Sequence, residues 1–392
     1  MYSIYNILTS TIYLFRSVNN AIVTINTKNN TVSNLIPNNI PISTSPIIIS
    51  SGTQFSYSIL TNYTVYAYDY NSNLIYIFCR LAGANTCSIF NSSTSLYETL
   101  YFTYNIITNT LQSYYFSTSV QFTGAIFAQY ANNNKIYLFE RYGSNHIITI
   151  NTNDNTYLLS TSTFNSKSYN AIYDPINNYF WCLPNSTNYF TVINVNNNTK
   201  RFVSIMKVTT LTTLTISTGF FYNNCIYLVP YQTGKIYYFS VLNSNTAELS
   251  SIIINEVSNI SFQTNISKAI MLNTNMVYIL SRMMDTTPSS IISLFNPTSN
   301  TDNSYGCPNL CTNIFNLAAL KFNQSIFNIQ FDGGIAAIDA NDNIVIYSIS
   351  FVGQSVLTQN MVYYFNPITI NKGIYANYST LHPNNNYYRN NW

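Results

Sequence analysis

The sequence predicts an all-β protein made of repeated four-stranded sheets, and two observations lead to that prediction. An apolar pentapeptide recurs along the chain, as TIYLF at Thr11, LIYIF at Leu74, KIYLF at Lys135, NYFWC at Asn178, CIYLV at Cys225, MVYIL at Met276 and, more weakly, GIAAI at Gly334. In the best copies a turn threonine follows at a constant offset of about 20 residues, as from Ile136 to Thr156. A period of roughly 40 to 60 residues is typical of a propeller or an array.

Each copy divides into the same elements, which are clearest between Gly124 and Thr163. In order, they are a strand GAIFAQY, a turn ANNN, a strand KIYLFE, a loop RYGSN, a strand HIITI, a turn NTNDN and a strand TYLLSTS. Asparagine and glycine pairs tolerate left-handed backbone angles and so close tight hairpins. Such pairs stand at the expected hairpins, Asn132–Asn134, Asn177–Asn178, Asn223–Asn224 and Asp332–Gly334.

The second and third strands of each copy are nearly continuous apolar runs, which is typical of sheets covered on both faces. Blades stacked around an axis provide that cover and protect strand edges. We therefore predict a single β-propeller of seven four-stranded blades over residues 1–366, followed by a C-terminal extension over 367–392. The expected second-strand positions are Ile12, Ile75, Ile136, Phe180, Ile226, Val277 and Ile335. Insertions expected near Pro37–Ser50, Asn105–Ser119 and Asp302–Leu320 keep six or eight blades open as alternatives.

The turn pattern I-x-T-I-N-T-x-x-N-T occurs at Ile22–Thr31 and at Ile147–Thr156. It resembles the YVTN-type β-propeller repeat. The resemblance covers most of the chain and implies the fold only, because propellers host unrelated functions.

Composition narrows the function classes. Charged residues make up 7% of the chain and the net charge is +3, with no run of lysine or arginine, so we expect no nucleic-acid partner. No apolar stretch reaches the length of a transmembrane helix, and the N-terminus lacks the pattern of a signal peptide. The bias toward Asn, Ile, Tyr, Ser and Thr resembles structural proteins of viruses of acidophilic crenarchaea, with large AT-rich DNA viruses as a second candidate. We expect a virion or an extracellular surface as the location.

Recognisable catalytic groupings are scarce. Twelve carboxylates are scattered along the chain, whereas a propeller glycosidase needs two or three that converge on the channel. His146 begins a third strand without a serine or carboxylate partner in a triad pattern, and no glycine-rich phosphate loop occurs. We predict a protein that is not an enzyme and that uses no cofactor.

Six cysteines favour disulfides or buried thiols over a metal site. Cys79 and Cys87 flank one hairpin loop, and Cys307 and Cys311 share the loop GCPNLC, so each pair is a candidate disulfide. Both histidines lie far from these pairs in sequence and C-x3-C is a poor zinc spacing, so no metal is predicted.

Four arginines stand at one blade position, the start of the loop between the second and third strands. They are Arg16, Arg80, Arg141 and Arg282. They either cap their own blades by bonding carbonyls and nearby acids, or form a face that accepts anions or docks a partner.

The resulting functional hypothesis is a non-enzymatic virion structural or surface protein that displays rigid loops for subunit contacts or host attachment. Its partners would be other virion or surface subunits, with a host glycan as a further candidate, and the extension from residue 367 either docks on a subunit or is frayed. A secreted carbohydrate-binding propeller is the alternative, and a propeller glycoside hydrolase is the third hypothesis.

Overall fold

In the computed structural model, the residues that are described form strands and turns only. The described ranges are 2–6, 8–15, 22–29, 31–35, 47–48, 54–55, 65–78, 88–121, 125–131, 133–140, 146–160, 170–206, 214–230, 235–242, 251–257, 266–271, 277–281, 292–295, 335–338, 344–347, 361–365 and 372–377. Within these ranges no helix has the length and apolar character needed to cross a membrane.

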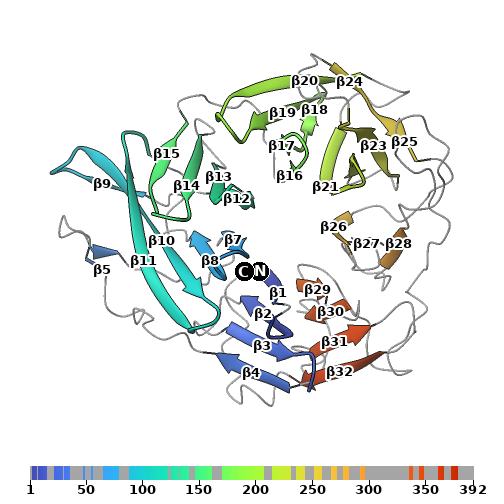
Figure 1. Ribbon diagram of the computed structural model, residues 1–392, viewed down its shortest axis with the longest axis horizontal. Coiled ribbons are helices and arrows are strands. Elements are labelled where there is room, and N and C mark those ends of the chain that lie inside the picture. The colour runs from blue at the N-terminus through green and yellow to red at the C-terminus, as the bar shows by residue number, and fades with distance from the viewer. Residues whose placement is uncertain are drawn as a thin grey trace, which may run out of the picture.

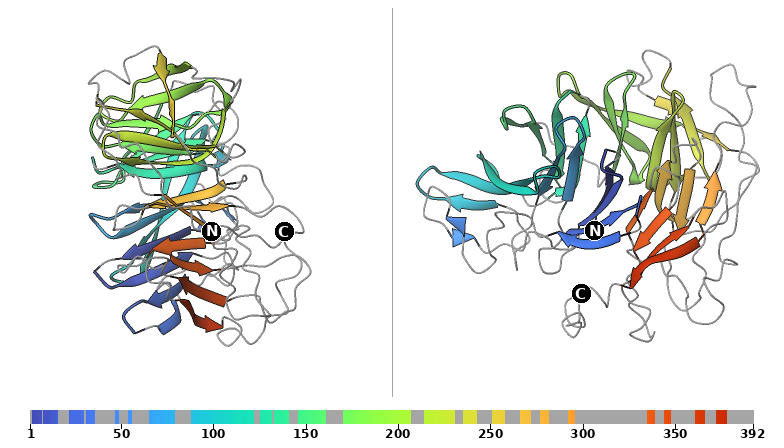
Figure 2. Two further views of the ribbon diagram at one scale, coloured as in Figure 1. Left: turned by 90° about the vertical axis from the view of Figure 1, so that its right-hand side faces the viewer. Right: turned by 60° about the horizontal axis from the view of Figure 1, so that its bottom comes forward.

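Seven sheets of three to five strands surround a central axis in the described part of the chain (Figure 1). In six of these sheets the first strand in the chain lies nearest the axis, and later strands lie farther out (Figure 1). A view from the side shows the sheets stacked face against face around the ring (Figure 2). The prediction of an all-β propeller is therefore confirmed, while the blade number of the whole chain stays a prediction.

Three sheets come from the first half of the chain. The first contains β1 (Tyr2–Asn6), β2 (Thr11–Phe15), β3 (Ile22–Asn26) and β4 (Thr31–Leu35). The second contains β7 (Val65–Asp69), β8 (Leu74–Phe78), β10 (Leu96–Asn105) and β11 (Thr110–Thr118), with β9 (Ser88–Asn91) paired to β10. The third contains β12 (Ala125–Ala131), β13 (Lys135–Glu140), β14 (Ile147–Asn151) and β15 (Tyr157–Leu159). A hairpin of β5 (Ile47–Ile48) and β6 (Gln54–Phe55) stands apart from these sheets.

Four more sheets complete the described ring. The fourth contains β16 (Ala171–Asp174), β17 (Tyr179–Cys182), β19 (Tyr189–Asn194), β20 (Lys200–Met206) and β24 (Ser251–Ile253). The fifth contains β18 (Asn185–Thr187), β21 (Leu214–Tyr222), β22 (Cys225–Pro230), β23 (Tyr237–Ser240) and β25 (Asn255–Glu256). The sixth contains β26 (Ile266–Met271), β27 (Val277–Ser281) and β28 (Ile292–Phe295), and the seventh contains β29 (Ile335–Ile338), β30 (Ile344–Tyr347), β31 (Met361–Phe365) and β32 (Lys372–Asn377).

The ring closes by packing rather than by a shared sheet. The first and seventh sheets each take all their strands from one end of the chain. They lie side by side because β1 contacts β29 and β4 contacts β32 (Figure 1). No strand from one terminus is hydrogen-bonded into the sheet of the other terminus among the described residues.

Six of the seven predicted anchors lie in the second strand of their sheet, when the added strand β18 of the fifth sheet is left out of the count, and the seventh prediction was wrong. Ile335 belongs to β29, which is the first strand of its sheet, and the second strand is β30 with the sequence IVIY. The weak anchor GIAAI lacks the aromatic residue of the other copies, whereas β30 carries a tyrosine after an isoleucine. Both strands of this hairpin are apolar, so the pattern alone did not separate them.

Two predicted boundaries also differ from the structure. Strand β32, inside the predicted C-terminal extension, pairs with β31 from Met361↔Asn377 to Phe365↔Lys372, so the last sheet runs past residue 366. The segment 105–119, expected as an insertion, supplies the end of β10 and the whole of β11, which is the outer strand of the second sheet. The insertion in that sheet lies instead between β8 and β10, where β9 is added.

Burial on both sides of each sheet explains the continuous apolar runs. In β13, Ile136 and Leu138 pack in one cluster with side chains of the second sheet, including Tyr76. The alternating residues Tyr137 and Phe139 pack in another cluster with Phe180 of the fourth sheet. Because successive side chains of a strand point to opposite faces, a strand between two neighbours needs apolar residues at every position.

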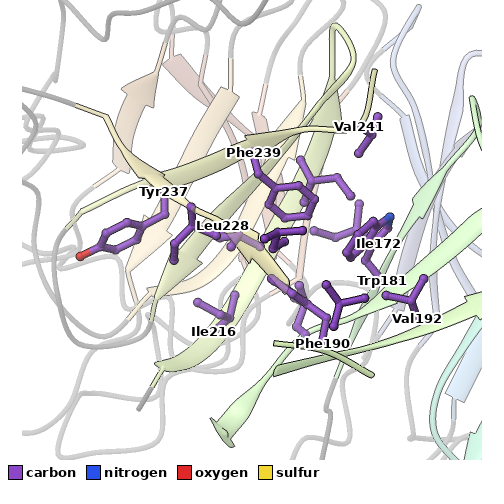
Figure 3. Close-up of a cluster of buried hydrophobic side chains, with 14 residues drawn as sticks. Ile172, Trp181, Phe190, Val192, Ile216, Leu228, Tyr237, Phe239 and Val241 are labelled. Carbon is purple, nitrogen blue, oxygen red and sulfur yellow. The ribbon is translucent and has the colours of Figure 1, made fainter. Parts of the chain in front are cut away.

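The fourth and fifth sheets are linked by short strands. Strand β18 lies in the connection between β17 and β19 of the fourth sheet, and it pairs with β21 of the fifth sheet. In the other direction, the segment after β23 of the fifth sheet first adds β24 parallel to β20 of the fourth sheet. It then returns to the fifth sheet, where β25 pairs with β23. Between the two sheets lies a cluster of buried apolar side chains around Trp181, Phe190 and Phe239 (Figure 3). Gly219 of β21 allows a close approach between the sheets, since a Cβ there would collide with the Tyr227 carbonyl oxygen of its own sheet and would stand 2.5 Å from a methyl carbon of Ile172 in the fourth sheet.

A tyrosine follows the anchor isoleucine in several sheets, and in two of them its hydroxyl joins neighbouring sheets. The Tyr137 hydroxyl donates to the carbonyl oxygen of Val195 in the fourth sheet at 2.7 Å, and both residues are buried. Tyr13 has the same relation to the carbonyl oxygen of Ile106 in the second sheet, at 3.5 Å. The hydroxyl of Tyr76, at the equivalent position, is buried without a hydrogen-bond partner among the described residues.

Removing these two hydroxyls should therefore have different effects. We expect Tyr137→Phe to lower the free energy of unfolding by about 1–2 kcal/mol, because the buried Val195 carbonyl loses its shorter hydrogen bond and keeps only the one from Asn133 Nδ2 at 3.5 Å. Tyr76→Phe should be neutral or slightly stabilising, because it removes a buried polar group that has no partner there. Chemical denaturation of both variants measures the difference, and equal losses in the two would contradict this account.

Candidate functional site

One face of the propeller carries the turns between first and second strands and the turns between third and fourth strands. In each of the first five sheets the two turns are bonded to each other. Examples are Thr27 N–H to the Ser10 carbonyl at 2.9 Å and Thr152 N–H to the Asn134 carbonyl at 2.8 Å. The same bond joins Ile106 to Asn73, Val195 to Asn178 and Val241 to Asn224. We call this surface the turn face.

Side-chain amides link the turns of neighbouring sheets across this face. Asn71 donates to the Tyr130 hydroxyl at 2.8 Å, which joins the second and third sheets. Asn177 donates to the Val241 carbonyl at 3.0 Å, which joins the fourth and fifth sheets. Asn6 donates to Asn73 Oδ1 and Asn133 to the Val195 carbonyl, each at 3.5 Å, so the turns of the first five sheets form one connected surface.

Asparagine and aspartate shape the turns in two ways. The first residue of a turn accepts backbone N–H groups through Oδ1, as Asn26 does from Lys28 at 2.9 Å and from Asn29 at 3.3 Å. A later residue takes left-handed backbone angles, which asparagine tolerates well. Residues of this second kind are Asn73, Asn109, Asn134, Asn155, Asn178 and Asn198. The high asparagine content therefore has a local structural cause on this face.

A cluster of tyrosines lies on the turn face between the second and third sheets. The rings of Tyr70 and Tyr130 meet edge to face at a centroid distance of 5.1 Å. Tyr130 also donates to Asn134 Oδ1 at 3.2 Å. Burial, together with the nearby Asp69 carboxylate, raises the pKa of Tyr130 to about 12. Tyr70 is half exposed and presents an aromatic surface beside the Asn71 amide.

The carboxylates whose side chains are described serve in local structure. Asp69 and Asp174 are buried at the ends of first strands, where each accepts two backbone N–H groups of its turn. Glu98 accepts from Asn91 at 2.7 Å, and Asp154 accepts from the N–H and hydroxyl of Thr156 at 2.9 and 2.7 Å. Glu256 pairs with Lys235 at 2.5 Å. The hydrogen bonds from Thr156 hold the pKa of Asp154 below its usual value.

The predicted site residues lie mostly outside the described part of the chain. Arg16, Arg80, Arg141 and Arg282 are outside it, so the arginine ring stays a prediction, and so do the pairs Cys79–Cys87 and Cys307–Cys311. Cys225 forms a disulfide, whereas Cys182 is a buried free thiol. No cluster of three or more possible metal ligands occurs among the described residues.

Exposed apolar side chains on the turn face form a set that was not predicted from the sequence. Each stands two residues after the side chain that caps its turn, and its N–H is bonded to that cap. The set, which we call the apolar turn residues, is Leu8, Ile107, Ile176 and Leu242. An apolar residue at the second position after a turn-opening Asn, Asp or Ser was the signal that could have revealed them.

Comparison with known proteins supports the fold of this chain and no particular function. No protein-family model matches the chain, and no curated protein matches its sequence. Similar solved structures include the WD40 repeats of RRP9, with a TM-score of 0.49, 9% identity and coverage of 92% of each chain. A putative 6-phosphogluconolactonase from Bacteroides fragilis has a TM-score of 0.49 and 9% identity, covering 93% of this chain and 92% of that one. The β-propeller domain of Cps50 (Swd1) from Myceliophteria thermophila has a TM-score of 0.46 and 9% identity, covering 74% and 85%.

Proposed function

We propose that this chain is a non-enzymatic structural or surface protein of a virion, whose propeller displays rigid turns for subunit contacts or host attachment. The observation that carries the proposal is the use of the described carboxylates. Asp69 and Asp174 lie at the ends of first strands, near the axis where a propeller hydrolase would place its acids, yet both are buried turn caps. Their hydrogen bonds serve the fold.

The surface chemistry agrees with a scaffold exposed to a harsh medium. Charged residues are 7% of the sequence, and apart from the apolar turn residues the turn face is built mainly from amides, hydroxyls and aromatic rings. Such groups keep their protonation state across a wide pH range on the acid side, because amides and alcohols do not titrate there. Aromatic residues with polar tips also suit protein interfaces.

Two measurements test the proposal. The first is fractionation of the native source, in which we expect the chain as a stoichiometric part of a particle. The second uses Asp69→Asn, which keeps the cap because Asn6 holds the equivalent turn of the first sheet through Oδ1. We expect the variant to fold and to be incorporated like the wild type. Recovery as a free protein with hydrolytic turnover that Asp69→Asn abolishes would overturn the proposal.

A carbohydrate-binding role is the second candidate, and one observation favours it. The Tyr70 ring is half exposed, is held by Tyr130, and lies beside the Asn71 amide. An aromatic surface next to an amide offers both the stacking and the hydrogen bonds that a neutral sugar uses. Glycan binding by the isolated protein that Tyr70→Ala abolishes would favour this role over a purely structural one.

A further inference from the structure

We infer that the turn face is an interface between two copies of this chain. The inference names a partner for the proposed scaffold and rests on that function. It starts from the apolar turn residues, which are large and well exposed: Leu8 is 73% exposed, Ile107 55%, and Ile176 and Leu242 47% each. Tyr70 adds a half-exposed ring on the same face.

These side chains are not required by the turns that carry them. The same position, two residues after the capping side chain, is occupied by Asn71, Asn153 and Asn196 in other turns, with the same N–H bond to the cap. A polar residue therefore satisfies the local geometry equally well. An exposed leucine or isoleucine at such a position does not serve the turn, and burying its apolar surface against a partner is favourable.

The charges of the face favour a second copy over a partner with an ordinary surface. Among the described turn residues, the exposed charged side chains are Lys28 and Asp154, which have opposite signs. About a quarter of the residues of an average protein are charged, and burying such charges against apolar and amide groups leaves them unpaired. A second turn face brings few charged side chains that would have to be desolvated, which are Lys28 and Asp154 among the described turn residues.

The polar groups of one turn face can also form hydrogen bonds with the same groups of a second turn face. An asparagine side chain both donates and accepts hydrogen bonds, so a surface of asparagines can satisfy an identical surface. In a twofold contact each residue meets its counterpart patch on the other copy. Apolar turn residues then pack together while exposed amides such as Asn153 and Asn196 pair at the same interface.

Analytical ultracentrifugation of the isolated protein tests the contact. We expect a reversible dimer whose affinity changes little with salt, because few charges are buried. The double variant Leu8→Asn with Ile176→Asn copies the residue found in other turns, and it should weaken the dimer by roughly a hundredfold or more. The control is Leu158→Asn with Ile253→Asn, which removes exposed apolar residues of outer strands and should leave the affinity unchanged.

A second measurement does not depend on the variants. Amide hydrogen exchange of the wild type, compared between concentrations above and below dimer dissociation, should show added protection at Leu8, Ile107 and Ile176. A wild type that is monomeric at all concentrations, or equal weakening by the control variant, would overturn the inference. Because isolated protein is used, failure here is distinct from failure to find the chain in a particle.

Discussion

Trp181→Ala should destabilise the propeller by about 3–5 kcal/mol, the cost typical of removing a large aromatic side chain from a core. Trp181 is fully buried between the fourth and fifth sheets. Its ring meets Phe239 at a centroid distance of 4.8 Å and Phe190 at 5.6 Å. The alanine variant leaves a cavity whose walls are strands of two sheets, and those strands cannot both move inward without breaking their own pairing.

Circular dichroism during chemical denaturation measures this loss. Trp181→Phe should cost less than the alanine variant, because it keeps an aromatic ring and removes an indole N–H that is buried without a hydrogen-bond partner among the described residues. Leu158→Ala, at an exposed position of β15, should change the free energy of unfolding by no more than about 0.5 kcal/mol. Similar losses at Trp181 and Leu158 would mean that the fourth and fifth sheets do not share a core.

Alkaline solution should unfold this protein steeply above pH 10. Burial raises the pKa of Tyr137 and Tyr130 to about 12. It raises the pKa of other buried tyrosines further, and these are Tyr76, Tyr101, Tyr104 and Tyr227. A raised pKa in the folded state means that the fold holds the neutral phenol. The stabilisation is therefore complete below the unfolded pKa of about 10 and is lost as pH rises toward the folded pKa.

The free energy of unfolding should fall steeply with pH in this range. Each such tyrosine lowers the free energy of unfolding by about 1.4 kcal/mol per pH unit within its window. Six of them together give on the order of 8 kcal/mol per unit, comparable with the whole stability of a typical domain. Far-ultraviolet circular dichroism and tyrosinate absorbance should change together in one cooperative step. Ionisation of all tyrosines near pH 10 with the strands intact would contradict the buried positions, and Tyr76→Phe should move the step to higher pH.

Much of the fold was determined by local sequence. The anchors place second strands correctly in six sheets because each needs apolar residues toward two neighbours, as Ile136 and Tyr137 show. The asparagine turns were equally predictable, since left-handed angles at Asn134 and Asn178 are a property of single residues.

Only the tertiary structure decided how the sheets are joined and what their surfaces present. Ile335 lies in the first strand of its sheet, β29, which pairs with β30. This strand order is set by the pairing and cannot be read from the apolar residues next to Ile335. Likewise, Lys372–Asn377 became a strand because Met361–Phe365 offers it an open edge. Exposure of Leu8 and Ile176 depends on which face of the ring their turns occupy, and that follows from contacts between segments far apart in the chain. Sequence patterns report the periodicity of one strand or the geometry of one turn, whereas burial, pairing partner and shared surface are properties of several segments together.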